Sequence, residues 1–151
     1  MRQNIIVTIM IVIGASGIGW GQKAVKNADI LLAPGWKQIY DAYTPDAQSI
    51  EKLRIKAPEL KVDIYFGYWC DDSKNNLPVF LKILDTLNIP EFKANFYEVE
   101  KKSTAVQKYY VEDMLVEKVP TFIFYINDSE MGRIIENPHD TILQDMMRIV
   151  L

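Results

Sequence analysis

The sequence predicts an α/β fold in which a central mixed sheet is flanked by helices, and three observations carry this prediction. Residues 62–66 show the alternation of a strand, a stretch with helical spacing follows, and a second strand is expected at 94–99, where Phe96 and Val99 are the apolar positions. This order favours a parallel strand pair joined by a helix. A run of β-branched and aromatic residues at 121–126 precedes a turn signal, and a final helical stretch closes the chain. We expect about four strands, with helices on both faces.

Composition restricts the class of protein. The chain has 151 residues, of which 49% are hydrophobic and 25% charged, and this length fits one domain. Seventeen basic and twenty acidic side chains give a net charge of −3, so no positive field favours nucleic acid, and we expect no nucleic-acid partner. One cysteine and one histidine exclude an internal disulfide and a multi-cysteine zinc site. We expect a monomer with no metal and no cofactor.

The first 21 residues differ from the rest. Arg2 precedes an apolar run at 5–13, and small residues follow up to Gly21, which is the pattern of a secretory signal peptide. The run is shorter than the ~20 residues that span a bilayer. We therefore expect residues 1–21 to be a signal peptide and the protein to be exported to the periplasm or the extracellular space. The alternatives are an uncleaved segment that anchors the protein to the membrane, and a buried N-terminal helix.

Residues 22–58 are expected to form a helical lead-in to a domain that spans 59–151. The pattern up to residue 35 is weak and indicates a leader. Helical spacing then predicts a short helix that ends before Pro45, since the residue before a proline disfavours helical geometry. A second helix begins near Asp46 and closes by Pro58.

The remaining elements follow in order from the strand at 62–66. The helix after it contains Pro78, which removes a backbone donor and should mark a bend. The later elements are a strand at 94–99, a helix at 105–110, strands at 121–126 and 132–136 joined by a turn at 127–128, and a helix at 142–150 with Asp140 placed to cap it.

The stretch between the first strand and the long helix carries a motif, Tyr65-Phe66-Gly67-Tyr68-Trp69-Cys70-Asp71-Asp72-Ser73-Lys74. It resembles the strand-to-helix active-site turn of the thioredoxin superfamily, in which a tryptophan precedes the first cysteine of a Cys-x-x-Cys pair. Pro78 matches the proline that kinks the family's helix, and Val119-Pro120-Thr121 resembles its cis-proline loop. These signals occur in the right order within the right elements.

The resemblance implies a thioredoxin-like fold, a cis bond between Val119 and Pro120, and a reactive thiol at Cys70. It also implies that Trp69, the residues of the cis-proline loop (Val119, Pro120 and Thr121) and Asp72 line or support a substrate groove. The implied partners are protein or small-molecule thiols and disulfides, and a membrane only where the N-terminal segment stays attached.

Two departures from the family pattern affect the mechanism. Ser73 occupies the position of the second cysteine, so the step that expels a bound substrate cannot be intramolecular. Ile64 occupies the position, six residues before Cys70, where two-cysteine members often carry a buried carboxylate. The neighbouring Asp63 should point to the opposite face of its strand.

Local chemistry acts on the Cys70 thiol in two directions. The N-terminus of the following helix favours the thiolate, and a hydrogen bond donated by the Ser73 hydroxyl to the sulfur acts in the same direction. Asp71 and Asp72 oppose it because nearby negative charge disfavours a second anion. The two carboxylates are interpreted first as residues that stabilise the start of the helix. A specific role for Asp72, in relaying a proton or contacting substrate, is the alternative.

Three functions are compatible with these residues. The first is a redox protein in which Cys70 alone forms a mixed disulfide that an external thiol resolves. The second is a non-catalytic module that binds extended peptide beside the cis-proline loop. The third is a scaffold subunit in which Cys70 has no function. Replacing Cys70 by serine separates them, because only the first loses its activity.

Overall fold

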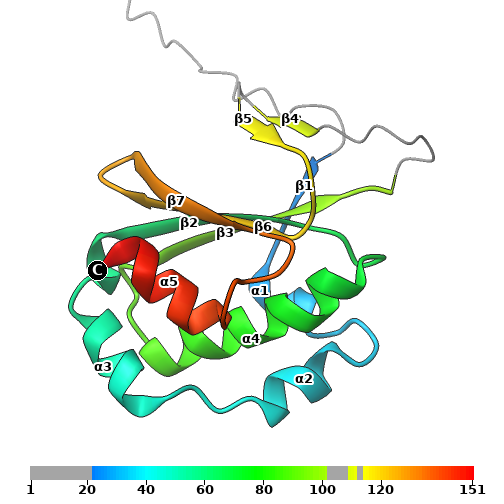
Figure 1. Cartoon of the computed structure of the whole chain (residues 1–151). Helices are drawn as coiled ribbons and strands as arrows, with labels where there is room; N and C mark the ends of the chain where they lie inside the picture. The colour runs from blue at the N-terminus through cyan, green and yellow to red at the C-terminus, as the bar shows by residue number, and fades with distance from the viewer. Residues whose placement is uncertain (1–21, 102–108, 112–113) are drawn as a thin grey trace, which may run out of the picture.

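The computed structural model describes residues 22–101, 109–111 and 114–151 (Figure 1). The segment expected to be a signal peptide, residues 1–21, lies outside the described residues. Within the described ranges, no helix has both the length and the hydropathy needed to cross a membrane.

A mixed sheet of five strands forms the centre of the domain, in the order β1-β3-β2-β6-β7. The strands are β1 (Gln22–Val25), β2 (Leu60–Phe66), β3 (Lys93–Val99), β6 (Thr121–Ile126) and β7 (Ser129–Ile135). Strands β2 and β3 are parallel, and every other neighbouring pair is antiparallel. The parallel pair and the β6–β7 hairpin are the two units that the sequence predicts.

The helices pack together on one face of this sheet (Figure 1). They are α1 (Asn27–Ile30), α2 (Trp36–Ala42), α3 (Ala47–Arg54), the 3₁₀ turn η1 (Ala57–Glu59), α4 (Asp71–Leu87) and α5 (Ile142–Val150). Their apolar sides and the inward residues of β2, Val62, Ile64 and Phe66, form the main core. Pro78 is buried inside α4, which continues past it to Leu87.

On the opposite face of the sheet, the structure differs from two expectations. No described helix covers it, so the expectation of helices on both faces is wrong for this part of the chain. A helix is expected at 105–110, but Tyr109 and Tyr110 belong to the strand β4 (Tyr109–Val111), which pairs with β5 (Met114–Val116). Residues 105–108 lie outside the described ranges. Aromatic and β-branched residues favour strands, and here that preference prevails. A smaller buried cluster on this side consists of Tyr65, Val99, Val116, Val119, Ile123 and Tyr125.

Two further expectations are corrected near the chain ends. The weakly patterned residues after 21 form β1, which pairs with β3 from Gln22 opposite Val99 to Val25 opposite Phe96 and adds a fifth strand to the sheet. The cap of α5 is Thr141, whose hydroxyl accepts a hydrogen bond from the Gln144 backbone N–H at 3.1 Å. Asp140, which the sequence suggested for this role, precedes the cap.

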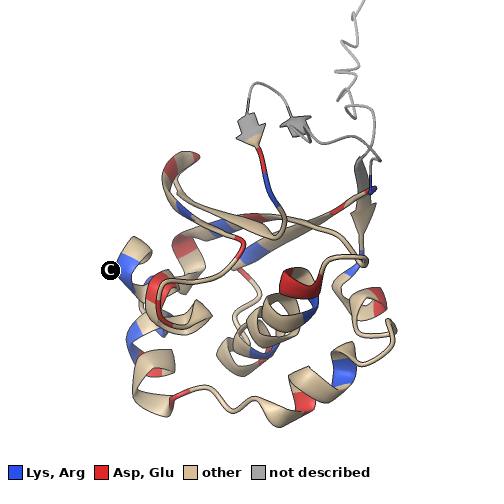
Figure 2. Cartoon of the chain, turned by 45° about the vertical axis from the view of Figure 1, so that its right-hand side comes forward, with Lys and Arg blue, Asp and Glu red and all other residues tan. Residues whose placement is uncertain are grey.

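Charged side chains of both signs are spread over the elements in the view of Figure 2. The N-terminal end of α4 is acidic, because Asp71 and Asp72 fall in its first turn. This end of α4 lies beside the candidate site.

Candidate functional site

The turn between β2 and α4 places Cys70 at the N-cap of the helix. The Cys70 backbone is extended, with φ −100° and ψ 122°, and its carbonyl accepts the Lys74 N–H at 3.0 Å, so helical bonding begins here. The Cys70 N–H donates to the Gly67 carbonyl at 3.0 Å and closes the turn. Cys70 is partly exposed, and its thiol sits where unpaired helix N–H groups favour an anion.

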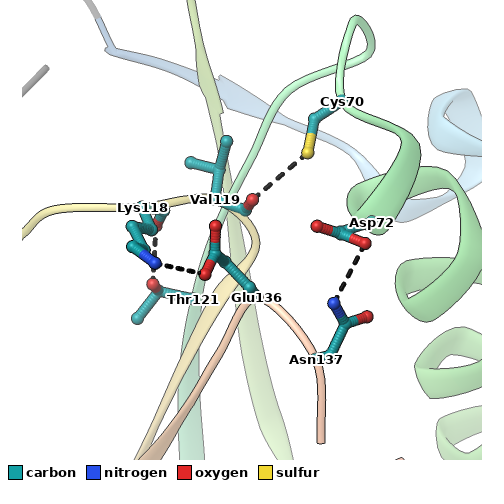
Figure 3. A network of polar contacts seen from close by, with 7 residues as sticks. All are labelled: Cys70, Asp72, Lys118, Val119, Thr121, Glu136 and Asn137. Carbon is teal, nitrogen blue, oxygen red and sulfur yellow. Dashed lines mark hydrogen bonds and ion pairs between the residues drawn. The ribbon is translucent and has the colours of Figure 1, made fainter.

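The loop before β6 faces this thiol. The peptide bond between Val119 and Pro120 is cis. The Cys70 thiol donates a hydrogen bond to the Val119 carbonyl, with Sγ and oxygen 3.2 Å apart (Figure 3). The Thr121 hydroxyl donates to the Lys118 carbonyl at 2.7 Å and fixes the shape of the loop. The structure thus brings together four of the predicted site residues, Cys70, Val119, Pro120 and Thr121.

Trp69 forms one edge of the site. Its indole is 39% exposed, and its Nε1–H donates to the Val99 carbonyl at 2.9 Å, which ties the turn to the end of β3. The Lys101 ammonium lies 5.7 Å from the indole centroid. Gly67 lies directly against the indole, since a Cβ there would be 2.6 Å from Trp69 Nε1.

Tyr68 packs into the helical layer. Its ring is 5.2 Å from that of Trp36 and 5.1 Å from that of Phe66, measured between centroids. Burial raises the pKa of the Tyr68 hydroxyl, and Glu98 and Asp29 act in the same direction. The side chain therefore anchors the turn to the core.

Ser73 makes a different contact from the one expected. It is fully buried, and its Oγ accepts a hydrogen bond from the Gly67 backbone N–H at 3.2 Å. Among the hydrogen bonds of the described residues, none joins Ser73 to the sulfur of Cys70. Ser73 thus connects the first turn of α4 to the end of β2.

Asp72 is linked to a residue that the sequence did not single out. Its Oδ1 accepts a hydrogen bond from Asn137 Nδ2 at 3.1 Å, across 65 residues of chain (Figure 3). Asn137 in turn accepts from Asn76 Nδ2 at 3.0 Å, and the same Nδ2 lies 3.0 Å from the Glu136 carbonyl. No sequence pattern marks Asn137, because asparagine is common in loops.

The cis-proline loop is also joined to the end of β7. The Glu136 N–H donates to the Pro120 carbonyl at 2.7 Å, and the Glu136 carboxylate pairs with Lys118 at 2.5 Å. The hydrogen bond between the Lys118 ammonium and the Glu136 carboxylate raises the pKa of Lys118. Glu136 has a φ of 60°, a left-handed value that turns the chain toward α5.

The strand below the site confirms the predicted placement of Asp63. Ile64 lies in the main core, and Asp63 accepts a hydrogen bond from Asn95 at 2.8 Å and pairs with Lys61 at 3.6 Å. Side chains alternate along a strand, so the carboxylate faces away from the helical layer. Within the described ranges, no three His, Cys, Asp or Glu side chains are grouped to hold a metal ion.

Comparison with known proteins agrees with this geometry. The family model described as Thioredoxin matches residues 22–148, which includes β1 and every other element up to α5. No curated protein matches the chain. No solved structure matches it either. The match covers most of the chain, and the fold has a parallel β-α-β unit, a Trp-Cys turn at a helix start and a facing cis-proline loop. The chain therefore belongs to the thioredoxin family.

Proposed function

We propose that the protein carries out thiol-disulfide exchange through Cys70 alone. The observation that supports this most directly is the position of the sulfur. Cys70 is a partly exposed residue at the start of α4, and its sulfur lies 3.2 Å from the Val119 carbonyl of the cis-proline loop. A structural cysteine is typically buried and surrounded by apolar side chains, whereas a reactive one is accessible and close to partial positive charge.

The reaction begins with loss of the thiol proton to solvent. The Cys70 thiolate then attacks one sulfur of a substrate disulfide, a new S–S bond forms, and the second substrate sulfur leaves as a thiolate that takes up a proton. The substrate disulfide has been exchanged for a mixed disulfide, and no electrons have entered from outside. The hydrogen bond to Val119 must break before attack, which frees the carbonyl for a substrate backbone N–H.

Release of the bound substrate needs a second thiol. Cys70 is the only cysteine in the sequence, and Ser73 Oγ is buried and bonded to Gly67. An external thiol, either a small thiol or one from a protein, therefore attacks the mixed disulfide, forms a disulfide with the substrate sulfur and regenerates Cys70. The chemistry suits isomerisation or protein–small-thiol exchange better than rapid reduction.

We further propose that the protein acts outside the cytoplasm, on the basis of the N-terminal sequence of residues 1–21. Oxidising compartments are where protein disulfides persist and where substrates for exchange occur. Sequencing the N-terminus of the protein from its native compartment tests this. A start between residues 17 and 23 supports export, and an intact Met1 in soluble cytoplasm contradicts it.

Trapping of the mixed disulfide tests the proposed reaction. The full chain is incubated with a peptide that contains one disulfide, quenched with acid, and weighed by mass spectrometry. We expect one peptide adduct on the wild type, none on Cys70→Ser, and an unchanged yield on Ser129→Ala, a matched control at an exposed serine of β7. An unmodified wild-type thiol after prolonged incubation contradicts the proposal. Peptide that binds Cys70→Ser as tightly as the wild type, without any adduct, favours a binding module instead.

A further inference from the structure

Two asparagines, which we call the amide bridge (Asn76 and Asn137), connect Asp72 to the end of β7. Asn137 Nδ2 donates to Asp72 Oδ1 at 3.1 Å, and Asn137 Oδ1 accepts from Asn76 Nδ2 at 3.0 Å. Asn76 Nδ2 is also 3.0 Å from the carbonyl of Glu136, the residue whose N–H bonds to Pro120. The bridge therefore spans from the first turn of α4 to the cis-proline loop.

Burial fixes the orientation of the bridge. Asn76 is only 9% exposed, and a buried amide loses free energy unless its polar atoms are paired. Asn76 and Asp72 lie four residues apart on α4 and so share one helix face. Because the Asn76 amino group faces the Asn137 oxygen, the Asn137 amino group must face Asp72. The amide bridge thus presents a donor, and not an acceptor, to the carboxylate.

The carboxylate held in this way is a charge that acts on Cys70. Asp72 follows Cys70 by two residues in the first turn of α4, and a negative charge close to a thiol disfavours the thiolate. A hydrogen bond donated to a carboxylate oxygen compensates part of its charge and restricts where it can move. Figure 3 shows Asp72 between Cys70 and Asn137, with one oxygen directed to the Asn137 amide.

We infer that Asn137 is a positioning residue for the reactions of Cys70: it holds the Asp72 carboxylate against the amide bridge and so limits the repulsion between that carboxylate and the thiolate. The inference rests on the proposed role of Cys70 in thiol-disulfide exchange. It assigns to the loop after β7 an influence on the nucleophile that the family motif around Cys70 does not contain.

Other charged side chains lie on the elements around the Cys70 turn. Lys118 and Glu136 form an ion pair, and Lys101 lies beside the Trp69 ring. Among the described residues these are Asp71, Asp72 and Lys74 of α4, Glu98 of β3, Lys101, and the Lys118–Glu136 pair. The variants at Asp72 and Asn137 change none of the other side chains in this group.

The test is the pH dependence of Cys70 alkylation by iodoacetamide, a neutral reagent, in the full chain. Asn137→Ala leaves the carboxylate uncompensated, and we expect the midpoint of the profile to rise by about 0.5 pH unit, a roughly threefold slower reaction below the midpoint. Asp72→Asn removes the charge, and we expect the midpoint to fall by a similar amount, about 0.5 pH unit. In the Asp72→Asn background, Asn137→Ala should change nothing.

Matched controls separate this effect from a general one. Asp71→Asn removes a charge from the neighbouring exposed residue, which in the described part of the chain forms no hydrogen bond with the amide bridge, so Asn137→Ala should keep its full effect in that background. Asn75→Ala removes an exposed amide next to Asn76 and should leave the profile unchanged. Asn137→Ser, which is too short to join Asn76 to Asp72, replaces Asn137→Ala if that variant fails to fold.

The outcomes distinguish this inference from the proposed function. An unchanged midpoint in Asn137→Ala and Asn137→Ser, or an equal shift with and without Asp72, overturns the positioning role. Alkylation measures the thiol directly and needs no disulfide substrate. If the midpoints shift as expected but no peptide adduct forms, the role of Asn137 stands and the exchange reaction is overturned. If adducts form but the midpoints do not shift, the exchange reaction stands and the role of Asn137 is overturned.

Discussion

Gly67→Ala should destabilise the active-site turn through one contact. A Cβ at this position would lie 2.6 Å from Trp69 Nε1, 2.7 Å from Cε2 and 3.1 Å from Cζ2. Gly67 has no left-handed φ, so alanine suits the backbone, and the three atoms nearest to the added Cβ all belong to the indole. The indole must move, and the hydrogen bond from its Nε1 to Val99 is then lost.

The cost follows from these contacts. Forcing an extra methyl group into a packed site typically costs about 1–3 kcal/mol, and a lost hydrogen bond about 1 kcal/mol. The two terms overlap, because the indole relieves the clash by giving up the bond. We therefore expect Gly67→Ala to lower the free energy of unfolding by about 1–3 kcal/mol, which corresponds to a fall of about 1 M in the urea midpoint.

A double-mutant cycle with Trp69→Ala isolates the contact. Trp69→Ala removes the three atoms nearest to the new methyl group, so adding Gly67→Ala to Trp69→Ala should cost much less than adding it to the wild type. Gly132→Ala is the control, since its Cβ would meet only the Ile149 side chain, at 3.2 Å. Urea unfolding gives the free energies. A fully additive cycle, or Gly67→Ala as stable as the wild type, would refute the reasoning.

Two further predictions concern stability and titration away from the turn. Thr141→Ala removes the acceptor for the Gln144 N–H and should cost about 1 kcal/mol in urea unfolding, whereas Asp140→Ala should change little; the reverse order would show that Asp140 is the cap. The Tyr40 hydroxyl donates a hydrogen bond to the Asp85 carboxylate. This bond, followed by burial, raises the pKa of Tyr40 from 10.0 to about 12. The contribution of the Tyr40 hydroxyl to stability is therefore complete below pH 10 and is lost as the pH rises through about 12. Ultraviolet titration should show one tyrosine ionising at lower pH in Asp85→Asn, and an unchanged curve would contradict this.

Local sequence patterns predict much of the fold and the centre of the site. The alternation along β2 places Val62 and Ile64 in the core, and it places Asp63 on the other face. The Trp-Cys turn and the Val-Pro-Thr loop resemble thioredoxin motifs, and this resemblance implies a cis-proline loop beside Cys70. The structure places the Cys70 sulfur 3.2 Å from the Val119 carbonyl.

The features that the sequence did not predict depend on tertiary contacts. Four residues at Gln22–Val25 carry too weak a pattern to indicate a strand, and only pairing with β3 makes them one. The hydroxyl of Ser73 meets Gly67 because the turn folds back on α4. The Asn76–Asn137 contact joins residues 61 positions apart, and neither residue type marks such a pairing.

Cys70 acts without an internal partner thiol in the proposed reaction, and the rate of insulin disulfide reduction tests this property most directly. Losing an intramolecular partner forfeits an effective molarity that can reach about 10⁵ M. We predict that the wild type reduces insulin slowly unless a small thiol is added, that Cys70→Ser is inactive in both conditions, and that Ser73→Cys is active with a dithiol recycling partner alone. A wild type that turns over as fast as Ser73→Cys without any small thiol would contradict the account.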